Sequence, residues 1–278
     1  MALIATSLNS LQPTERRVAE AILQAPEDVV ELTAQQLADR VGVGRSTVVR
    51  ACQSFGYRGF PQLRVALATA LGGSGEAPDY GEGVLGRMRA EIGRIAQSLP
   101  QAVSVLDETS MEWVVRGIAN AGRVLIVANG LSAPIASDLS MRLTAIGRPA
   151  EFVPDAIAQQ ISASTLGADD MCLVVSGSGA NEASLRAARQ ASGRSAKIVA
   201  LTSFAVSALT TLADEAIVIA PAGQSFRDEL EHTSRVAHAV FVEVFVGAVT
   251  HAIGENARLT REQVMGILSD NLDDGGSD

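Results

Sequence analysis

The sequence predicts a small all-α domain followed by a larger α/β domain. Residues 1–71 contain only short amphipathic patterns of helical period, whereas short β-branched runs alternate with helical stretches from Arg123 onward. Between them, residues 72–83 read GGSGEAPDYGEG, a composition that cannot pack and that predicts a flexible linker. We therefore expect domains over residues 1–71 and 84–270, with residues 271–278 as a disordered tail.

Composition bounds the class of protein. The chain has 278 residues, of which 47% are hydrophobic and 19% charged, so it can bury a sizeable core. Because no secretory leader and no uninterrupted apolar run of membrane-spanning length is evident, we expect a cytoplasmic protein. Cys52 and Cys172 are too far apart for a disulfide framework or zinc site and are expected to be buried thiols. With three His in the chain, neither a metal cluster nor another cofactor is expected.

Three short helices are predicted before the linker. The first begins at Thr14 and should end at Pro26, with one apolar face formed by Val18, Ala21, Ile22 and Ala25. Thr33 and Gln36 have the spacing of a capping box for the second. After the tight turn at residues 42–44, the third should bury Val48, Val49, Cys52 and Phe55. Two short helices joined by a three-residue turn with Gly predict a helix-turn-helix, with a hairpin in an ordinary helical bundle as the alternative.

Charge along the chain favours contact between this domain and DNA. The net charge is -9, but no acidic residue occurs between Asp39 and Glu76, where five Arg fall. Such a cationic segment suits a phosphate backbone, although a solvated helix face would have the same composition. In a helix-turn-helix the second helix enters the major groove. The residues that we expect to contact DNA are Arg45, Ser46, Thr47 and Arg50 on this helix, with Arg58 and Arg64 beyond it placed for phosphates.

The second domain predicts a doubly wound fold. Five short runs, RVLIVA, PAEFV, MCLVVS, AKIVALT and EAIVIA, alternate with helical segments, which indicates a five-stranded parallel sheet flanked by helices. Residues 84–120 predict two or three helices, with Trp113 in the core, and residues 228–252 predict one long helix. His238 and His251 lie on the apolar pattern of that helix and are expected to be packed.

Two loops at predicted strand ends favour anion binding. Residues 128–132, ANGLS, and residues 176–181, SGSGAN, each lead from a strand into a helix. Small residues there expose backbone N–H groups, hydroxyls add donors, and a helix N-terminus favours negative charge. Because GK[ST] is absent and the first loop lacks GxGxxG, a phosphate monoester is the predicted ligand. The alternative is that both loops are simply turns and helix caps.

These segments together resemble a known family of regulators. The stretch from LQPTERR to QLRVAL closely resembles the helix-turn-helix of RpiR-type regulators, and ISAST, VVSGSG, ALTSF, LADEAIVIAPAG and SFRDELEHTSRVA resemble the sugar isomerase (SIS) domain that follows it there. The resemblance implies transcriptional control of sugar metabolism, with a phosphosugar effector bound to the SIS domain. By position it implies an effector site formed by Gly130, Ser132, Ser176, Gly177, Ser178 and Asn181.

The chain departs from the family pattern at several positions. Asn181 stands where Thr is common, although an amide can still donate a hydrogen bond. Ala128 replaces the usual Gly of the first loop, a change that bears on the backbone path of the loop, and Gly44 replaces the usual capping Ser. The often basic pair at the end of the reading helix is Gln53-Ser54, which reduces positive charge and should shift the operator that is read.

Catalysis is the rival interpretation, because aldose–ketose isomerases share the SIS fold. Glu182 stands one position early for the usual catalytic Glu, whose place is taken by Ala183. Glu229, Glu231 and His232 could reach a site from a neighbouring subunit, but surface charges on a helix are the more ordinary interpretation. We therefore expect a non-enzymatic regulator that forms a homodimer or tetramer on double-stranded DNA. An isomerase with an accessory helical domain, and a DNA-binding dimer whose SIS domain serves only assembly, are the alternatives.

Overall fold

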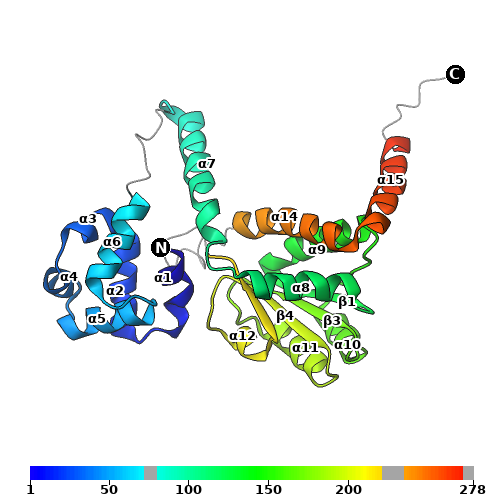
Figure 1. Ribbon diagram of the computed structural model, residues 1–278, viewed down its shortest axis with the longest axis horizontal. Coiled ribbons are helices and arrows are strands. Elements are labelled where there is room, and N and C mark those ends of the chain that lie inside the picture. Colours follow the sequence, from blue (N-terminus) through cyan, green and yellow to red (C-terminus); the bar gives the residue numbers. More distant parts are fainter. Residues whose placement is uncertain (72–79, 221–234, 272–278) are drawn as a thin grey trace. The chain divides into compact units, whose positions relative to one another are not determined.

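A computed structural model describes residues 1–71, 80–220 and 235–271 of the chain (Figure 1). Most of the predicted linker, the tail from residue 272, and Glu229, Glu231 and His232 lie outside the described residues. The chain divides into two compact units. The first contains Met1–Val105 with Ser203–Ser207 and the described ends of Val218–Ala237, and the second contains the rest. The predicted domain boundaries stay a prediction.

The first unit is helical. Its elements are α1 Ala2–Ser7, η1 Leu8–Ser10, α2 Pro13–Gln24, α3 Pro26–Glu31, α4 Ala34–Val41, α5 Arg45–Ser54, α6 Phe60–Leu71 and α7 Gly83–Ala102. Helices α1 to α6 share one apolar core, in which Ile22 of α2, Leu37 of α4 and Val48 of α5 are fully buried. The burial of these three side chains joins the two helices of the predicted helix-turn-helix to α2.

Pro26 begins a helix instead of only ending one. Ala25 leaves the helical conformation with φ of -141°, and Pro26 then occupies the first turn of α3, where its missing N–H costs nothing. The apolar face of α2 is also rotated from the prediction. Ala19 and Leu23 are buried beside Val18 and Ile22, whereas Ala21 and Ala25 are only half-buried. Ala21 packs against the core from the border of the predicted apolar face, whereas Ala25 lies outside the core cluster.

The turn between α4 and α5 forms as the sequence predicts. The Thr33 hydroxyl accepts from the Gln36 N–H at 3.2 Å, and the Gln36 side chain accepts from the Thr33 N–H at 2.8 Å, which completes the capping box. Gly42 ends α4 with φ of 68°, a left-handed conformation that favours glycine. Cys52 and Phe55 are buried as expected, and Val49 is half-buried.

The second unit contains a five-stranded sheet, which confirms the predicted fold class. Its strands are β1 Val124–Ala128, β2 Glu151–Phe152, β3 Met171–Val175, β4 Lys197–Thr202 and β5 Glu215–Val218, in the order β2-β1-β3-β4-β5. β1 pairs in parallel with both β2 and β3, and β3 pairs in parallel with β4. Because β1 and β3 are neighbours in register, Ala128 lies opposite Val175, and the loops that follow both strands leave the same edge.

Helices cover both faces of this sheet (Figure 1). The helical elements of this unit are α8 Glu108–Asn120, η2 Gly130–Ser132, α9 Ala133–Ala145, α10 Ala156–Ser164, α11 Glu182–Ser192, α12 Ala208–Leu212, α14 Val236–Ile253 and α15 Glu255–Asp270. Helices α10, α11 and α12 pack on the face that carries Leu125, Cys172 and Ile198. Helices α8, α9 and α14 lie on the other face (Figure 1). Strands buried on both sides explain the continuous apolar runs of the sequence.

Two packing predictions in this unit were wrong. Trp113 is 38% exposed instead of buried in the core, and His251 is exposed near the end of α14. His238, in contrast, is buried as expected, with 1% exposure. An apolar helical pattern predicts which face of a helix is buried, but it does not determine whether a residue at the edge of that face is buried or exposed.

Helix α14 is long and apolar enough to cross a membrane by length and composition alone. The expectation concerned an uninterrupted apolar run, and Glu243, His238 and His251 interrupt this helix. Its inward side packs like the core of a globular unit: Phe241 and Phe245 stack with ring centroids 5.3 Å apart, and Val242 and Val249 are fully buried. The ion pair between Glu243 and Arg142 of α9, at 2.7 Å, joins the helix to its neighbour.

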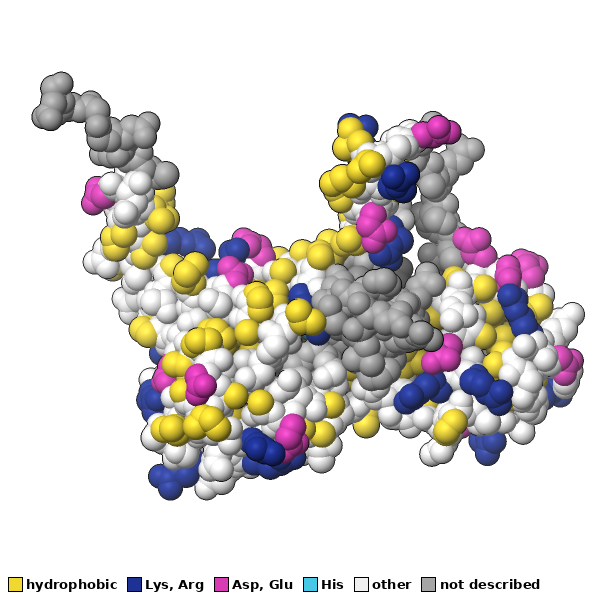
Figure 2. All heavy atoms as spheres, turned by 180° about the vertical axis from the view of Figure 1, so that it is seen from behind, with side chains coloured by type: hydrophobic (Ala, Val, Ile, Leu, Met, Phe, Trp, Pro, Cys, Tyr) yellow, Lys and Arg dark blue, Asp and Glu magenta, His cyan; other side chains and the backbone are white. Residues whose placement is uncertain are grey.

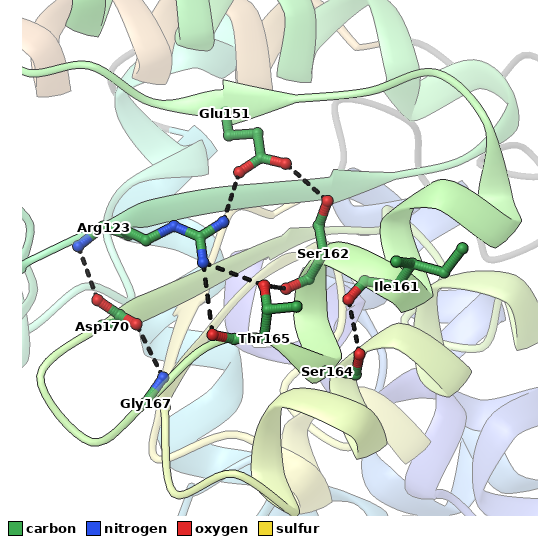
Figure 3. A network of polar contacts seen from close by, with 8 residues as sticks. All are labelled: Arg123, Glu151, Ile161, Ser162, Ser164, Thr165, Gly167 and Asp170. Atoms are coloured by element: carbon green, nitrogen blue, oxygen red, sulfur yellow. Dashed lines mark hydrogen bonds and ion pairs between the residues drawn. The ribbon is translucent and has the colours of Figure 1, made fainter.

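A polar network fixes the amino ends of the strands (Figure 3). Arg123, just before β1, donates to Glu151 of β2 at 2.8 Å, while Asp170 before β3 accepts from the Arg123 backbone N–H at 2.8 Å. The other carboxylate oxygen of Glu151 accepts from the Ser162 hydroxyl, and that of Asp170 accepts from the Gly167 N–H. Both carboxylates are thus satisfied by neighbouring elements, and the network holds the sheet edge opposite to the strand-end loops.

Candidate functional site

The reading face of α5 is exposed at three of the four predicted positions. Arg45, Ser46 and Arg50 are exposed, whereas Thr47 is only 7% exposed. The Thr47 hydroxyl lies 3.4 Å from the Arg50 guanidinium and accepts a hydrogen bond from it. Thr47 is thus better placed to orient Arg50 than to contact a base, and Arg45, Ser46 and Arg50 form the accessible set.

The structure divides the arginines of this unit into two groups. Arg64 is part-buried and its Nε donates to the Val30 carbonyl at the end of α3 at 2.8 Å, and Arg40 forms an ion pair with Asp28 at 2.9 Å. By contrast, Arg45 and Arg58 are exposed, and the described residues offer neither guanidinium a hydrogen bond or ion pair. Within the arginine-rich segment, Arg64 therefore ties helices together, while Arg45 and Arg58 are available for phosphates.

The two predicted anion loops meet in the second unit. The Gly177 backbone N–H, after β3, donates to the Ser132 hydroxyl, after β1, at 3.4 Å in buried surroundings. The Gly177 carbonyl in turn accepts from Thr202 at the end of β4 at 3.1 Å. Three neighbouring strands thus position one short backbone segment, so the loops form a single site at the carboxyl edge of the sheet.

Small residues and hydroxyls lie along these two loops. Ser176 is 4% exposed, and its hydroxyl has no hydrogen-bond partner among the described residues. Ser178 is half-buried, and its hydroxyl accepts from the Ala180 N–H at 3.3 Å. Gly130 adopts φ of 62° in η2, and Gly179 adopts the same left-handed value. Gly179 was not predicted as a site residue, although its place in the SGSG run could have indicated it.

The amide oxygen of Asn181 is engaged within the protein. It caps α11, because its Oδ1 accepts from the Ser184 N–H at 3.1 Å. Once the oxygen is used this way, Nδ2 is the only part of the amide left to reach a ligand, and it is a donor. This geometry suits a phosphate oxygen, and it explains how Asn can stand at a position where the family commonly has Thr.

Three polar residues beside the loops were missed by sequence reasoning. Asn129 Nδ2 donates to Gln159 Oε1 at 3.1 Å and to Ser184 Oγ at 3.0 Å. Gln159 comes from α10 and is fully buried, with its Nε2 donating to the carbonyls of Ala128 and Val153. Only the position of Asn129 inside the first loop could have been noticed in the sequence.

The carboxylate nearest to the loops in sequence is not placed as a general base. Glu182 accepts from Arg186 at 3.2 Å and from Arg189 at 3.1 Å. These hydrogen bonds hold the pKa of the Glu182 carboxyl below its usual range, and the bond from Arg189 has the largest effect. A base for sugar isomerisation needs a pKa nearer to neutral, so Glu182 is poorly suited to proton transfer.

A shallow hollow of about 450 Å³ lies at the opposite edge of the sheet. Trp113 and Gly117 of α8 line it together with Met171 and Lys197 at the amino ends of β3 and β4. The hollow explains the exposure of Trp113. It is separate from the strand-end loops.

Family models match both parts of the chain. Residues 1–74 match the model described as "Helix-turn-helix domain, rpiR family", and residues 117–242 match the model of the SIS domain. The two matches occur in the order that RpiR-type regulators have. The chain belongs to the RpiR-type transcriptional regulators.

Curated proteins of similar sequence and solved structures of similar fold are also found. The transcriptional regulator HexR of Pseudomonas aeruginosa is 28% identical over 66% of this chain and 66% of its own length. The bifunctional protein glk of Burkholderia thailandensis is 28% identical over 90% of this chain but only 40% of its own length. A structure of Vibrio vulnificus NanR, complexed with ManNAc-6P, has a TM-score of 0.61 and 24% identity, covering 97% of this chain and 99% of that one. The regions aligned with four curated HTH-type regulators span 63% to 68% of their lengths.

Proposed function

We propose that this RpiR-type regulator binds an operator through α5, and that a sugar phosphate bound at the strand-end loops changes its affinity for that operator. The observation that carries the effector half is the hydrogen bond between Gly177 and Ser132. Through it, two helix-initiating loops contribute backbone N–H groups, hydroxyls and the amide nitrogen of Asn181 to one anion site.

The DNA-binding half rests on exposed cationic side chains in a helix-turn-helix. Arg45, Arg50 and Arg58 are exposed, and the first unit supplies no carboxylate partner to any of the three among its described residues. On a protein of net charge -9, such a set favours local contact with a phosphate backbone.

A non-enzymatic role is favoured over isomerisation. Glu182 is engaged by two arginines, and its lowered pKa makes it a weak base. Sustained conversion of a phosphosugar by the purified full chain, lost in the Ser176→Ala variant, would favour the isomerase alternative. We further infer a cytoplasmic protein, since an operator must be reached there.

Self-association is the third part of the proposal. Apolar side chains are exposed along α15 (Figure 2), and α14 exposes three valines spaced one turn apart. These residues are Leu259, Met265, Ile267 and Leu268 on α15, and Val236, Val240 and Val244 on α14. Exposed apolar surface of this kind marks interfaces, and a two-fold dimer would present two recognition helices to a palindromic site. Light scattering of the full chain at micromolar concentration tests this, and a monomer would contradict it.

Thermal unfolding against a panel of phosphosugars tests the effector half. ManNAc-6P, the ligand named with the NanR structure, belongs in the panel beside hexose and pentose phosphates, free sugars and inorganic phosphate. A ligand at a hundred times its Kd should stabilise the folded state by about 2.7 kcal/mol. A selective rise in Tm with one phosphosugar, followed by altered operator binding, is the expected result. If no phosphosugar changes either quantity, the effector half of the proposal is wrong.

A further inference from the structure

A chain of amide and hydroxyl groups runs beneath the two loops, and its orientation is set by the backbone at both ends. At one end, Gln159 Nε2 lies 2.9 Å from the Ala128 carbonyl and 2.8 Å from the Val153 carbonyl. Carbonyl oxygens only accept hydrogen bonds, so the amide nitrogen of Gln159 must face them. Gln159 Oε1 therefore faces away from them, toward Asn129.

The orientation of Asn129 follows from that of Gln159. Since Gln159 Oε1 only accepts, the atom of Asn129 at 3.1 Å from it must be Nδ2. The second hydrogen of Nδ2 is donated to Ser184 Oγ at 3.0 Å. Both donors of Asn129 are thus used inside the protein. Its Oδ1 has no partner among the described residues and, in a half-buried residue, is not enclosed.

The other end of the chain fixes Asn181 in the opposite sense. The Ser184 N–H donates to Asn181 Oδ1 at 3.1 Å, and the Ser184 hydroxyl lies 3.4 Å from the same oxygen. Asn181 therefore offers a donor, Nδ2, to a ligand, whereas Asn129 offers an acceptor, Oδ1. One accessible amide is suited to a phosphate oxygen, and the other would repel it.

We propose that Gln159 is a positioning residue that holds Asn129 with its oxygen outward, so that Asn129 selects a phosphate ester carrying a hydroxyl close to the phosphate. The inference rests on the proposed effector site and deepens it. Asn129 directly precedes Gly130 in the first loop, so it belongs to the segment that is proposed to receive the phosphate. A sugar hydroxyl can donate to this oxygen, whereas a simple alkyl phosphate has no hydroxyl to offer. The site thereby favours a polyol phosphate over the phosphate group alone.

The test compares two ligands across matched variants of the full chain. Gln159→Met removes the amide and keeps a side chain of similar length. The control is Gln160→Met on the same helix, because among the described residues Gln160 Nε2 donates its one hydrogen bond to the Ala156 carbonyl of its own helix, at 3.0 Å. Calorimetric Kd values are measured for the phosphosugar that gives the largest Tm rise in the wild type and for methyl phosphate.

Wild type should bind the phosphosugar at least tenfold more tightly than methyl phosphate. Gln159→Met should lower phosphosugar affinity about tenfold, the scale of one hydrogen bond to a well-oriented partner, while leaving methyl phosphate affinity within about twofold. Gln160→Met should change neither. If Gln159→Met weakens both ligands equally, Gln159 has only a structural role. If it weakens neither, Asn129 is not oriented by it, and both results overturn the inference.

A second variant covers the case in which Gln159→Met fails to fold. Asn129→Ala removes the proposed acceptor itself and should show the same selective loss of phosphosugar affinity. Equal binding of both ligands by Asn129→Ala and wild type would refute the assignment. If wild type binds no phosphosugar at all, the proposed effector function is wrong. If wild type binds a phosphosugar and the variant keeps the same selectivity, only the role of Asn129 is wrong.

Discussion

The Ser132 hydroxyl accepts a hydrogen bond from the Gly177 N–H at 3.4 Å, although 45 positions separate the two residues in the chain. The contact exists because β1 and β3 are neighbours in a sheet whose second strand lies outside them, at the edge. Adjacent parallel strands deliver their following loops to the same place, which is the usual ligand position in such sheets. One sheet pairing thus creates the candidate effector site from two unremarkable Ser/Gly turns.

Ser176→Ala combined with Ser178→Ala should abolish the effector response while leaving operator affinity unchanged. The Ser176 hydroxyl has no hydrogen-bond partner among the described residues. Its removal should therefore change the stability of the fold little, while the ligand loses a hydrogen-bond donor. Operator binding is measured by fluorescence anisotropy with and without the phosphosugar. Ser192→Ala, at the exposed end of α11, is the matched control. A double variant that still responds like wild type would place the effector elsewhere.

Arg50→Ala should weaken operator binding by about 1–3 kcal/mol if its guanidinium reads a base edge. Arg50 is exposed on α5 and is oriented by the Thr47 hydroxyl at 3.4 Å. Affinity is measured at several salt concentrations, because loss of a base contact leaves the salt slope nearly unchanged whereas loss of a phosphate contact reduces it. Arg40→Ala serves as a control, since Arg40 is paired with Asp28. Equal affinities for Arg50→Ala and wild type would remove Arg50 from the interface.

Glu151 should contribute to stability at neutral pH and lose that contribution in acid. The hydrogen bond from Ser162, assisted by Arg123, lowers the pKa of the Glu151 carboxyl below its usual range (Figure 3). A carboxyl whose pKa is lower in the folded state stabilises the fold at pH values above its pKa in the unfolded chain. This stabilisation is lost as the pH falls through the pKa of the folded state. Because both members of the Arg123 pair are more than a third exposed, the contribution should be only about 0.2–1 kcal/mol.

Urea unfolding of wild type and Glu151→Gln between neutral pH and pH of about 3 measures this contribution. The two free energies of unfolding should differ at neutral pH and converge in acid. Ser162→Ala should reduce the difference, since it removes the largest cause of the shift. A difference that stays constant across the range would contradict the assignment.

Both thiols should resist modification in the native protein. Burial raises the pKa of Cys52 and that of Cys172 to about 12, so the reactive thiolate is scarce near neutral pH. Ellman's reagent at pH of about 8 should titrate no thiol before unfolding and both after it. Since the raised pKa penalises the folded state once unfolded thiols ionise, stability should also fall as pH rises above about 9. Cys172→Ala should reduce that dependence, and rapid native labelling would show the burial to be wrong.

The sequence predicted well those features that depend on local chemistry. Spacing alone indicated the Thr33 and Gln36 capping box, because a cap needs only one turn of helix. Three of the five apolar runs became the strands β1, β3 and β4, whose β-branched residues are buried on both faces. The turns at Gly42 and Gly130 follow from the ease with which glycine adopts positive φ.

Features that depend on tertiary partners were not predictable. Arg64 is as basic as Arg58 in the sequence, and only the fold places the Val30 carbonyl beside it. Thr47 became buried because α5 rotates it toward the core. Gln159 lies 30 positions after Asn129, and nothing in the α10 sequence identifies it as the residue that would orient the first loop. Long-range hydrogen bonds leave no periodic trace in a single sequence.

Trp113 sits in the hollow at the amino ends of the strands and is the only tryptophan of the chain, while both tyrosines, Tyr57 and Tyr80, belong to the first unit. Each unit therefore carries its own chromophore. Indole emission will follow the loss of the sheet unit, and tyrosine absorbance that of the helical one. Coincident melting curves from the two chromophores would mean that the units unfold as one cooperative block, and separated curves that they unfold independently. The distribution of three aromatic residues thus makes interdomain coupling measurable in the unlabelled protein.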